Sequence, residues 1–522
     1  MRGQPPKPGT SSIGVSSPLK PEVAESQGFP RGVLVLLFAL AFALRLFFLV
    51  FVSGFEYAGW YQDSFHHWQI AYYTLHIGLA QNPSRMWDLG GMEYFWGLFP
   101  TLIESFLLWV FNTASLLPFR VFNIIMGSVS TCLIYLVGRK YFGARVGLIS
   151  GLLIATSPIF FEIDTSGMLE PTGFSLMLAA LLLYEKRTYW SGFLLALASL
   201  CHVLFWFVAI ASIGSHLIFG RSRVRFVRSL LGWFTPMVPY FWFMQTRTGD
   251  WLYALRWNFF GNVAGGWISD IKLPLEAQII PRALAVVPLV AALTALLLLL
   301  KKKPKSYPLH VLFLTFIVIQ GAIYGLSAYV VPYIAMGQLG RLILDRLFAP
   351  DYYYLALLVG IGVVRLLKNS AFMSPQTGRP RLKLVTVVVL VLILANFATY
   401  PYVMGQYFLP TYHVPIVSQT MLAQEILSGY TGGTIVTGLP IVTYHLINAG
   451  IPYRNVLGSL YAPSGDRIEG YRWLIKENVT CIISDKNIGP IVQDGLKDAV
   501  ILPTTSPGVF SVNQTALRLI VP

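Results

Sequence analysis

Long apolar segments, separated by short polar or basic ones, dominate the first 400 positions of the chain. A helix needs about 20 mostly apolar residues to cross a bilayer, so these segments predict membrane-spanning helices. The chain is therefore predicted to be a polytopic α-helical membrane protein. Eleven spans are expected, over residues 32–53, 119–137, 146–161, 171–184, 189–201, 202–219, 229–245, 282–300, 309–330, 351–364 and 384–400.

One further apolar segment, Tyr94–Phe111, is ambiguous because it contains Pro100 and Glu104, and a carboxylate is costly at the bilayer centre. If this segment lies on the outer interface, five connections that hold 18 Lys and Arg residues and one acid all fall on the opposite side. Basic loops stay in the cytoplasm. We therefore predict an interfacial helix in the outer loop 54–118, a cytoplasmic N-terminus and an extracytoplasmic C-terminus. The five basic connections predicted to be cytoplasmic are residues 138–145, 185–187, 221–228, 301–305 and 365–383.

Three domains are expected from the change of pattern along the chain. Residues 1–31 are rich in Pro, Ser and Gly and predict a flexible cytosolic tail, and residues 32–405 form the transmembrane domain. In residues 406–522, strand-like runs at 434–438, 481–484 and 509–512 alternate with helical patterns at 442–448 and 467–477. Such alternation is typical of an α/β fold, so we expect a small extracytoplasmic α/β domain.

Composition narrows the class of protein. The 522 residues are 55% hydrophobic and 12% charged, about half the charge content of an ordinary soluble domain. The net charge of +15 is explained by basic cytoplasmic loops, so no nucleic-acid partner is expected. Cys132, Cys201 and Cys481 are too few for a disulfide framework. No nucleotide-binding glycine loop or zinc-hydrolase motif occurs, which disfavours nucleotide-driven transport and zinc hydrolysis.

The first candidate for chemistry is Asp63, about ten residues after the first span. The residues that follow carry Phe65, Trp68 and Tyr72 at helical spacing, which predicts a short interfacial helix with Asp63 near its start. Two interpretations stay open. A carboxylate there is stabilised by the helix dipole, and it is equally suited to act as a general base at the membrane surface.

Two more acids, Asp164 and Glu170, lie between two predicted spans on the same outer side. Glu170 directly precedes Pro171, so it could simply be an acid at a helix start. Because acids near membrane level are usually functional, a second carboxylate facing Asp63 is the favoured interpretation for Glu170, and Asp164 is a secondary candidate.

Arginines on the acidic outer side run against the charge bias. Arg120 opens the second span, and Arg341 and Arg346 precede the tenth. Arg341 could pair with Asp345 on one helix face. Alternatively, a guanidinium could grip a phosphate at the interface, since its planar fork binds two oxygens. Arg346 is the preferred phosphate ligand under this hypothesis.

Histidines offer weaker signals. His66 and His67 could hold a metal with Asp63, but adjacent helical residues point to different faces, so they are secondary candidates and a divalent metal is not favoured. His202 and His216, in apolar spans, are interpreted as packing residues.

This layout resembles the GT-C class of membrane glycosyltransferases, which includes protein O-mannosyltransferases, aminoarabinose transferases and prokaryotic relatives. Arg120 and the basic turn 138–145 are similar to the class pattern around its second and third spans. Glu170 falls at its second acidic position, and Arg346 with Pro350 resembles its R-Y-x-x-P motif. Each motif is short, and it is their order and shared side that carry the resemblance.

The chain also departs from the class pattern. Asp63 is followed by Ser64 where a second acid is common, and the Lys-Pro-Pro often found at the start of the interfacial helix is replaced by Tyr94–Pro100. The WWDxG-type motif of oligosaccharyltransferases is absent as well, which disfavours transfer of whole glycans.

The resemblance implies that one sugar is transferred, with inversion, from a polyprenyl-phosphate donor to a hydroxyl of a lipid, glycan or protein at the extracytoplasmic face. In that scheme Asp63 is the general base, Glu170 orients the acceptor or shares its proton, and Arg346, Arg341 or Arg120 binds the donor phosphate. The rival hypothesis is a lipid or solute transporter without transfer chemistry, which would require polar residues deep in the spans or inverted repeats.

Overall fold

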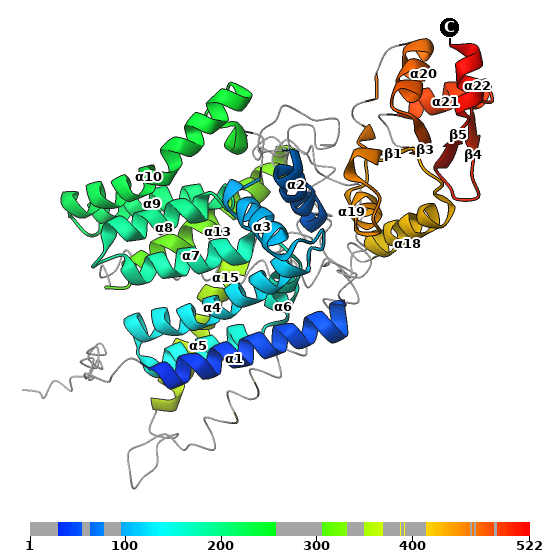
Figure 1. The fold of residues 1–522 in the computed structure, drawn as a ribbon. Helices are drawn as coiled ribbons and strands as arrows, with labels where there is room; N and C mark the ends of the chain where they lie inside the picture. Colours follow the sequence, from blue (N-terminus) through cyan, green and yellow to red (C-terminus); the bar gives the residue numbers. More distant parts are fainter. Residues whose placement is uncertain are drawn as a thin grey trace, which may run out of the picture.

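A computed structural model describes most of the chain (Figure 1). The described residues are 30–54, 63–77, 96–256, 305–330, 349–368, 387, 391, 414–459, 462–463, 466–484 and 488–521. They form a bundle of helices and a smaller α/β domain that carries the C-terminal end of the described chain.

The helical bundle follows the predicted apolar segments closely. Its helices are α1 (Arg31–Phe48), continued by the π-helical turn η1 (Leu49–Ser53), α2 (Asp63–Ile77), α3 (Leu98–Phe111), α4 (Leu117–Phe142), α5 (Ala144–Ala155), α6 (Pro158–Thr165), α7 (Glu170–Leu183), α8 (Thr188–Ser199), α9 (Leu204–Ile218), α10 (Arg223–Thr248), α13 (Tyr307–Val330) and α15 (Ala349–Lys368). The predicted spans 282–300 and 384–400, apart from positions 387 and 391, lie outside the described residues.

The predicted single span 146–161 is instead two helices. α5 and α6 meet at an angle of 62°. Pro158 stands in the first turn of α6, where its missing N–H costs nothing, whereas inside a continuous helix it would remove a backbone hydrogen bond. The chain therefore bends at residues 156–157.

By length and composition alone, three described helical segments could cross a membrane: Arg31–Ser53, Leu117–Phe142 and Ala349–Leu366. The bent pair α5–α6 adds a fourth. The segments 189–201 and 202–219 correspond to two separate helices, α8 and α9.

The segments that connect the described helices lie at the two ends of the bundle. At one end, here called the site end, Arg120 of α4 donates hydrogen bonds to the carbonyls of Gly54 and Thr165. At the other end Lys140 donates to the carbonyl of Leu181 at 3.1 Å, and Tyr307 stacks on Phe219 with ring centroids 5.6 Å apart. The connections at residues 54 and 165, which are predicted to lie outside, thus meet at the site end. The turns near residues 140, 184, 219 and 307 lie at the opposite end.

The C-terminal domain is built on a mixed five-stranded sheet of order β2-β1-β3-β5-β4. β1 pairs in parallel with β2 and β3, whereas β5 pairs antiparallel with β3 and β4. The strands are β1 (Thr434–Val436), β2 (Val456–Leu457), β3 (Val479–Ile483), β4 (Ile501–Pro503) and β5 (Val509–Val512). The helices are α18 (Val414–Gly429), α19 (Pro440–Asn448), α20 (Arg467–Lys476), α21 (Gly489–Lys497) and α22 (Gln514–Ile520), with a 3-10 turn, η6 (Tyr453–Asn455).

The two faces of the sheet pack against different helices. Ile435 faces the core shared with α18, α19 and α2, and its neighbour Val436 faces the core shared with α20, α21 and α22. Alternate residues of a strand point to opposite faces, so the apolar run in β1 serves both layers.

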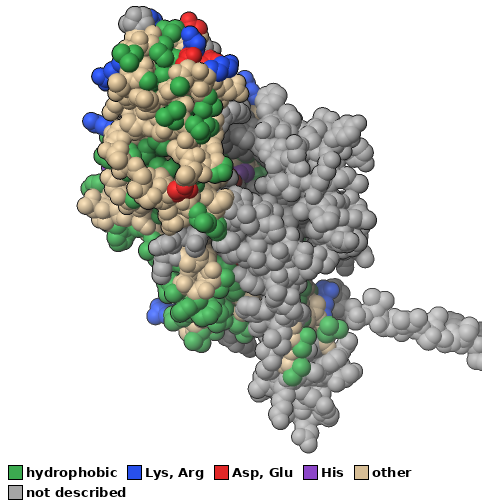
Figure 2. Space-filling view, turned by 90° about the vertical axis from the view of Figure 1, so that its right-hand side faces the viewer, with side chains coloured by type: hydrophobic (Ala, Val, Ile, Leu, Met, Phe, Trp, Pro, Cys, Tyr) green, Lys and Arg blue, Asp and Glu red, His purple; other side chains and the backbone are tan. Residues whose placement is uncertain are grey.

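The surface differs between the two parts of the molecule (Figure 2). Charged side chains gather on the upper part of the described surface, over the C-terminal domain, whereas hydrophobic side chains are prominent lower down. Large apolar side chains such as Val35, Phe51 and Trp242 are more than 60% exposed on the bundle helices. An apolar surface of this kind suits contact with lipid tails.

Candidate functional site

Asp63 is the first residue of α2 and is half-buried. Most of the ten residues after it are buried, although α2 carries polar side chains in its sequence. Trp68 donates from its indole nitrogen to the carbonyl of Ala114 at 2.7 Å, and the carbonyl of Ala71 accepts from Ser105 of α3 at 2.9 Å. α2 is therefore held from both sides by the segment that links α3 to α4 and by α3 itself.

The predicted interfacial helix is α3, and its buried face is the polar one. Thr101, Glu104 and Ser105 are buried, whereas Phe106 and Trp109 are 57% and 64% exposed. Burial raises the pKa of Glu104 well above its ordinary value. The arrangement favours lipid on the outer face of α3, with its polar face turned toward α2.

His66 and His67 both lie against Trp96, with ring centroids 5.7 Å and 4.6 Å apart. Burial lowers the pKa of His66 to about 4, although the nearby Asp63 carboxylate acts in the opposite direction. His66 is therefore neutral near pH 7. Within the described ranges, no three His, Cys, Asp or Glu side chains lie together as metal ligands would.

Glu170 is buried at the first position of α7, after a short connection from α6. Two side chains of α4 hold that connection. Arg120 donates from Nε to the carbonyl of Thr165, and Asn123, one helical turn later, donates to the carbonyl of Met168 at 2.7 Å. Because residues three apart share a helix face, one face of α4 fixes the approach to Glu170.

Arg120 is fully buried and links two connections. Its Nη1 donates to the carbonyl of Gly54 at 3.0 Å, and its Nη2 donates to the hydroxyl of Ser53 at 2.9 Å. Ser53 and Gly54 end the first span and open the loop that leads to Asp63. All three guanidinium nitrogens thus bond to protein oxygens, which favours a positioning role for this arginine over direct phosphate binding.

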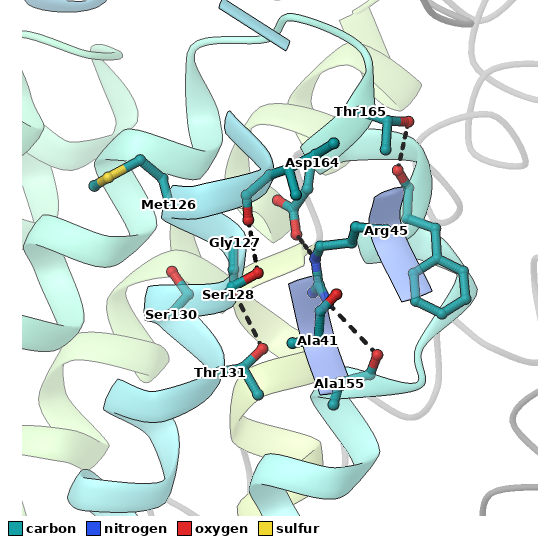
Figure 3. Close-up of polar contacts among 12 residues, drawn as sticks. Ala41, Arg45, Met126, Gly127, Ser128, Ser130, Thr131, Ala155, Asp164 and Thr165 are labelled. Atoms are coloured by element: carbon teal, nitrogen blue, oxygen red, sulfur yellow. Dashed lines mark hydrogen bonds and ion pairs between the residues drawn. The ribbon is translucent and has the colours of Figure 1, made fainter. Parts of the chain in front are cut away.

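Asp164 is engaged in a buried ion pair (Figure 3). Arg45 of α1 donates from Nε to its Oδ2 at 2.6 Å, and the two side chains are 0% and 1% exposed. Nη1 of Arg45 also donates to the carbonyls of Ala41 and Ala155. A Cβ on Gly127 would stand 2.0 Å from Oδ2, so only glycine allows α4 to approach this carboxylate. This partnership favours a structural role for Asp164.

Arg341 and Arg346 lie outside the described residues. The helix that follows them, α15, begins beside the predicted site. Tyr353, one turn into α15, contacts Phe160 of α6 and Phe174 of α7, with ring centroids 4.7 Å and 5.8 Å apart. The starts of α7 and α15 therefore lie at the same end of the bundle.

Several buried charged residues were not among the candidates proposed from the sequence: Arg45, Glu162 and Asp351. Each stands within or beside an apolar run, and an ionisable residue in such a run signals a role by itself. His216 stacks on Tyr184 with ring centroids 4.0 Å apart, in line with the packing role expected for it. His202 accepts at Nδ1 from the backbone N–H of Leu204 at 3.2 Å.

A helical bundle with a small α/β domain at one end agrees with the layout that the resemblance to the GT-C class implies. Residues 97–243, from α3 into α10, match the family model described as dolichyl-phosphate-mannose-protein mannosyltransferase. No curated protein sequence matches the chain.

Solved structures share the architecture. The chain is similar to ArnT from Cupriavidus metallidurans bound to undecaprenyl phosphate, with 12% identity, a TM-score of 0.53 and coverage of 94% of this chain and 99% of that one. ArnT in the apo state shares 14% identity with a TM-score of 0.50, and the match covers 93% of this chain and 99% of that one. The apo oligosaccharyltransferase from Archaeoglobus fulgidus shares 15% identity with a TM-score of 0.47, and the match covers 88% of this chain and 70% of that one. The family match and the ArnT fold confirm the predicted resemblance to the GT-C class.

Proposed function

We propose that the protein transfers one sugar from a polyprenyl-phosphate-linked donor to an acceptor hydroxyl at the extracytoplasmic face of the cell membrane. The family match to a dolichyl-phosphate-mannose enzyme and the fold shared with ArnT, whose structure holds undecaprenyl phosphate, support this class of donor. The acceptor is a hydroxyl of a lipid, glycan or protein.

The observation that carries the proposal is the position of Arg120. Its guanidinium bonds to Ser53 and Gly54, which lead toward Asp63, and to Thr165, which leads toward Glu170. Two acidic segments more than 100 residues apart in the chain thereby reach one end of the bundle. That end also contacts the C-terminal domain, since the N–H of Leu116 donates to Tyr444.

In the proposed reaction, Asp63 accepts the proton of the acceptor hydroxyl while the hydroxyl oxygen attacks the anomeric carbon of the sugar. The new bond joins the anomeric carbon to the acceptor oxygen, and the bond from that carbon to the phosphate oxygen breaks. The lipid phosphate departs with the electron pair. A single displacement of this kind inverts the anomeric configuration.

Glu170 and the arginines have supporting parts in this scheme. Glu170, buried at the start of α7, orients the acceptor hydroxyl. Arg346, aided by Arg341, neutralises the charge that grows on the departing phosphate. Its place three residues before α15 supports this role, because α15 begins beside α6 and α7. The lipid tail of the donor lies between spans, and a divalent metal is not favoured.

The topology proposed for this function keeps residues 1–31 in the cytoplasm and residues 406–522 outside it, with 32–405 as the catalytic membrane domain. The separation of the basic turns from the site end supports this orientation, since basic loops remain cytoplasmic.

The function is tested by the variant Asp63→Asn in the full chain, reconstituted with a polyprenyl-phosphate sugar and a range of acceptors. Because removal of a general base typically loses about 10²- to 10⁴-fold in rate, we expect kcat to fall at least 100-fold (the lower limit of that range). Asp494→Asn, which replaces a partly exposed acid of the C-terminal domain, is the matched control and should keep the wild-type rate. Full turnover by Asp63→Asn would refute the assignment, and movement of a labelled lipid without any glycoside product would favour the transporter.

A further inference from the structure

The C-terminal domain contacts the candidate site through one helix, α19. Tyr444 of α19 is buried, and its ring lies edge-on to two residues of α2: the centroid distances are 5.2 Å to Phe65 and 4.8 Å to Trp68. Phe65 stands two residues after Asp63. Edge-to-face aromatic pairs have a defined geometry, so the ring of Tyr444 sets where the first turn of α2 lies.

The hydroxyl of Tyr444 reaches a second element of the site. It accepts a hydrogen bond from the backbone N–H of Leu116 at 3.3 Å, directly before α4. Arg120, which binds both connections, follows one helical turn later. A single side chain of the C-terminal domain therefore contacts the helix that carries Asp63 and the start of the helix that carries Arg120.

Neighbouring contacts keep α19 in place. Asn448, one turn after Tyr444, donates to the carbonyl of Ala114 at 3.2 Å, the same carbonyl that accepts from Trp68. From the other side, His445 is hydrogen-bonded to Thr420 of α18 at 3.0 Å. Apolar residues of α2, α18, α19 and β1 form one continuous core. The contact is thus a packed interface between the domain and the bundle.

We infer that Tyr444 is a positioning residue for the transfer reaction: it sets the place and direction of the Asp63 carboxylate through Phe65 and Trp68. The C-terminal domain is accordingly part of the catalytic site's framework. This inference rests on the proposed function, in which Asp63 is the general base.

The physical reason is the sensitivity of proton transfer to geometry. A displacement of about 1 Å at a catalytic group can cost about 100-fold in rate. Loss of the Tyr444 ring would leave the first turn of α2 without its partner on α19. Binding of the lipid donor between the spans should be unaffected, because in the proposed scheme Asp63 of α2 acts on the acceptor hydroxyl and not on the lipid tail.

The test compares two buried tyrosines of the same domain in the full-length protein in lipid nanodiscs. Tyr471 belongs to α20 and lies in the core on the other face of the sheet, and its hydroxyl donates to Asp498 at 2.8 Å. The variants are Tyr444→Ala and Tyr444→Phe, with Tyr471→Ala and Tyr471→Phe as matched controls. Hydrogen exchange of α2 is measured together with kcat and the KM for a polyprenyl-phosphate sugar.

We expect Tyr444→Ala to accelerate hydrogen exchange in α2 and to lower kcat by about 10- to 100-fold with an unchanged donor KM. Tyr444→Phe retains both ring contacts, so it should restore most of the kcat and of the protection of α2. The Tyr471 variants should accelerate exchange in α20 and leave α2 and kcat near their wild-type values.

The inference is overturned if Tyr444→Ala leaves exchange in α2 unchanged, if α2 loosens while kcat stays at the wild-type value, or if Tyr471→Ala lowers kcat equally. The exchange measurement needs no turnover. It therefore separates this inference from the proposed function, which fails on its own if Asp63→Asn retains full activity.

Discussion

At the scale of single residues, two buried arginines organise the bundle. Arg45 joins α1 to α6 and to the last carbonyl of α5, and Arg120 joins the end of the first span to the connection before Glu170. A guanidinium presents several donors in a rigid fork, so one side chain can satisfy carbonyls from different segments. Lysine could not replace these contacts with its single nitrogen.

The Arg45–Asp164 pair predicts a strongly non-additive pair of variants. Arg45→Met leaves a buried carboxylate without its partner, which in general costs about 3–5 kcal/mol of stability. The double variant Arg45→Met with Asp164→Leu removes both charges and should recover much of that loss. Thermal unfolding in nanodiscs measures the effect, and additive losses in the double variant would show that the pair does not couple.

At the scale of elements, α2 is held by its neighbours and not by its own amphipathic pattern. Its buried stretch includes Ser64, His67 and Gln69, which an isolated surface helix would expose. Its aromatic residues instead pack on α19, on Trp96 and on η6, where His76 stacks on Tyr453 with centroids 5.2 Å apart. The position of Asp63 thus depends on several other elements.

Two histidines predict that the packing of α2 weakens in acid: His445 of α19 contacts Phe65 of α2, with ring centroids 6.4 Å apart, and His66 of α2 lies against Trp96. Burial lowers the pKa of both His66 and His445 to about 4, against 6.5 in an exposed histidine. As the pH falls from 6.5 toward 4, the undocked helices bind protons that the docked ones exclude, so docking loses stability. Hydrogen exchange of α2, corrected for intrinsic rates, should therefore accelerate at pH 5 relative to pH 7.5.

His66→Gln and His445→Gln are the variants that check this prediction. Each should reduce the acid sensitivity of α2, and the double variant should remove most of it. The Asp63 carboxylate beside His66 opposes the effect of burial but is the smaller influence. Equal acid sensitivity in the wild type and the double variant would assign the effect to other groups.

At the scale of the whole molecule, the site end of the bundle lies opposite the end that carries the basic turns near residues 140 and 220. The C-terminal domain sits at the site end, where Leu116 contacts Tyr444, and its surface carries ion pairs such as Arg467–Asp498. The bundle exposes apolar side chains instead. This division suits a protein with one part in lipid and another in water.

Thiol labelling checks the proposed orientation. Thr505→Cys, on the C-terminal domain, should react with a membrane-impermeant maleimide in intact cells, and Arg223→Cys, at the start of α10, only after permeabilisation. Replacement of the three native cysteines by serine removes background, of which Cys481 should give little because burial raises its thiol pKa to about 11. The reverse labelling pattern would invert the proposed topology.

Much of the fold could be predicted from the sequence because its causes are local. Apolar runs place α1, α4, α7, α13 and α15 within a few residues of their predicted bounds, and the strand-like runs at 434–438, 481–484 and 509–512 predict β1, β3 and β5. β2 and β4 were not predicted: β2 has only two residues, and β4 ends at Pro503, a residue type that is rare within strands except at a sheet edge. Pro158 was visible in the sequence, but the 62° bend that it allows depends on packing.

The sequence by itself located most of the apolar helices of the bundle and the acids and arginines available for chemistry, and it predicts which connections share a side of the membrane. Only the tertiary structure decided which of them meet. Asp164 meets Arg45 across 119 positions, and Leu116 meets Tyr444 across 328. Hydrophobicity and helix-start signals act over a few residues, whereas a buried charge or hydroxyl takes the partner that packing brings within hydrogen-bond distance.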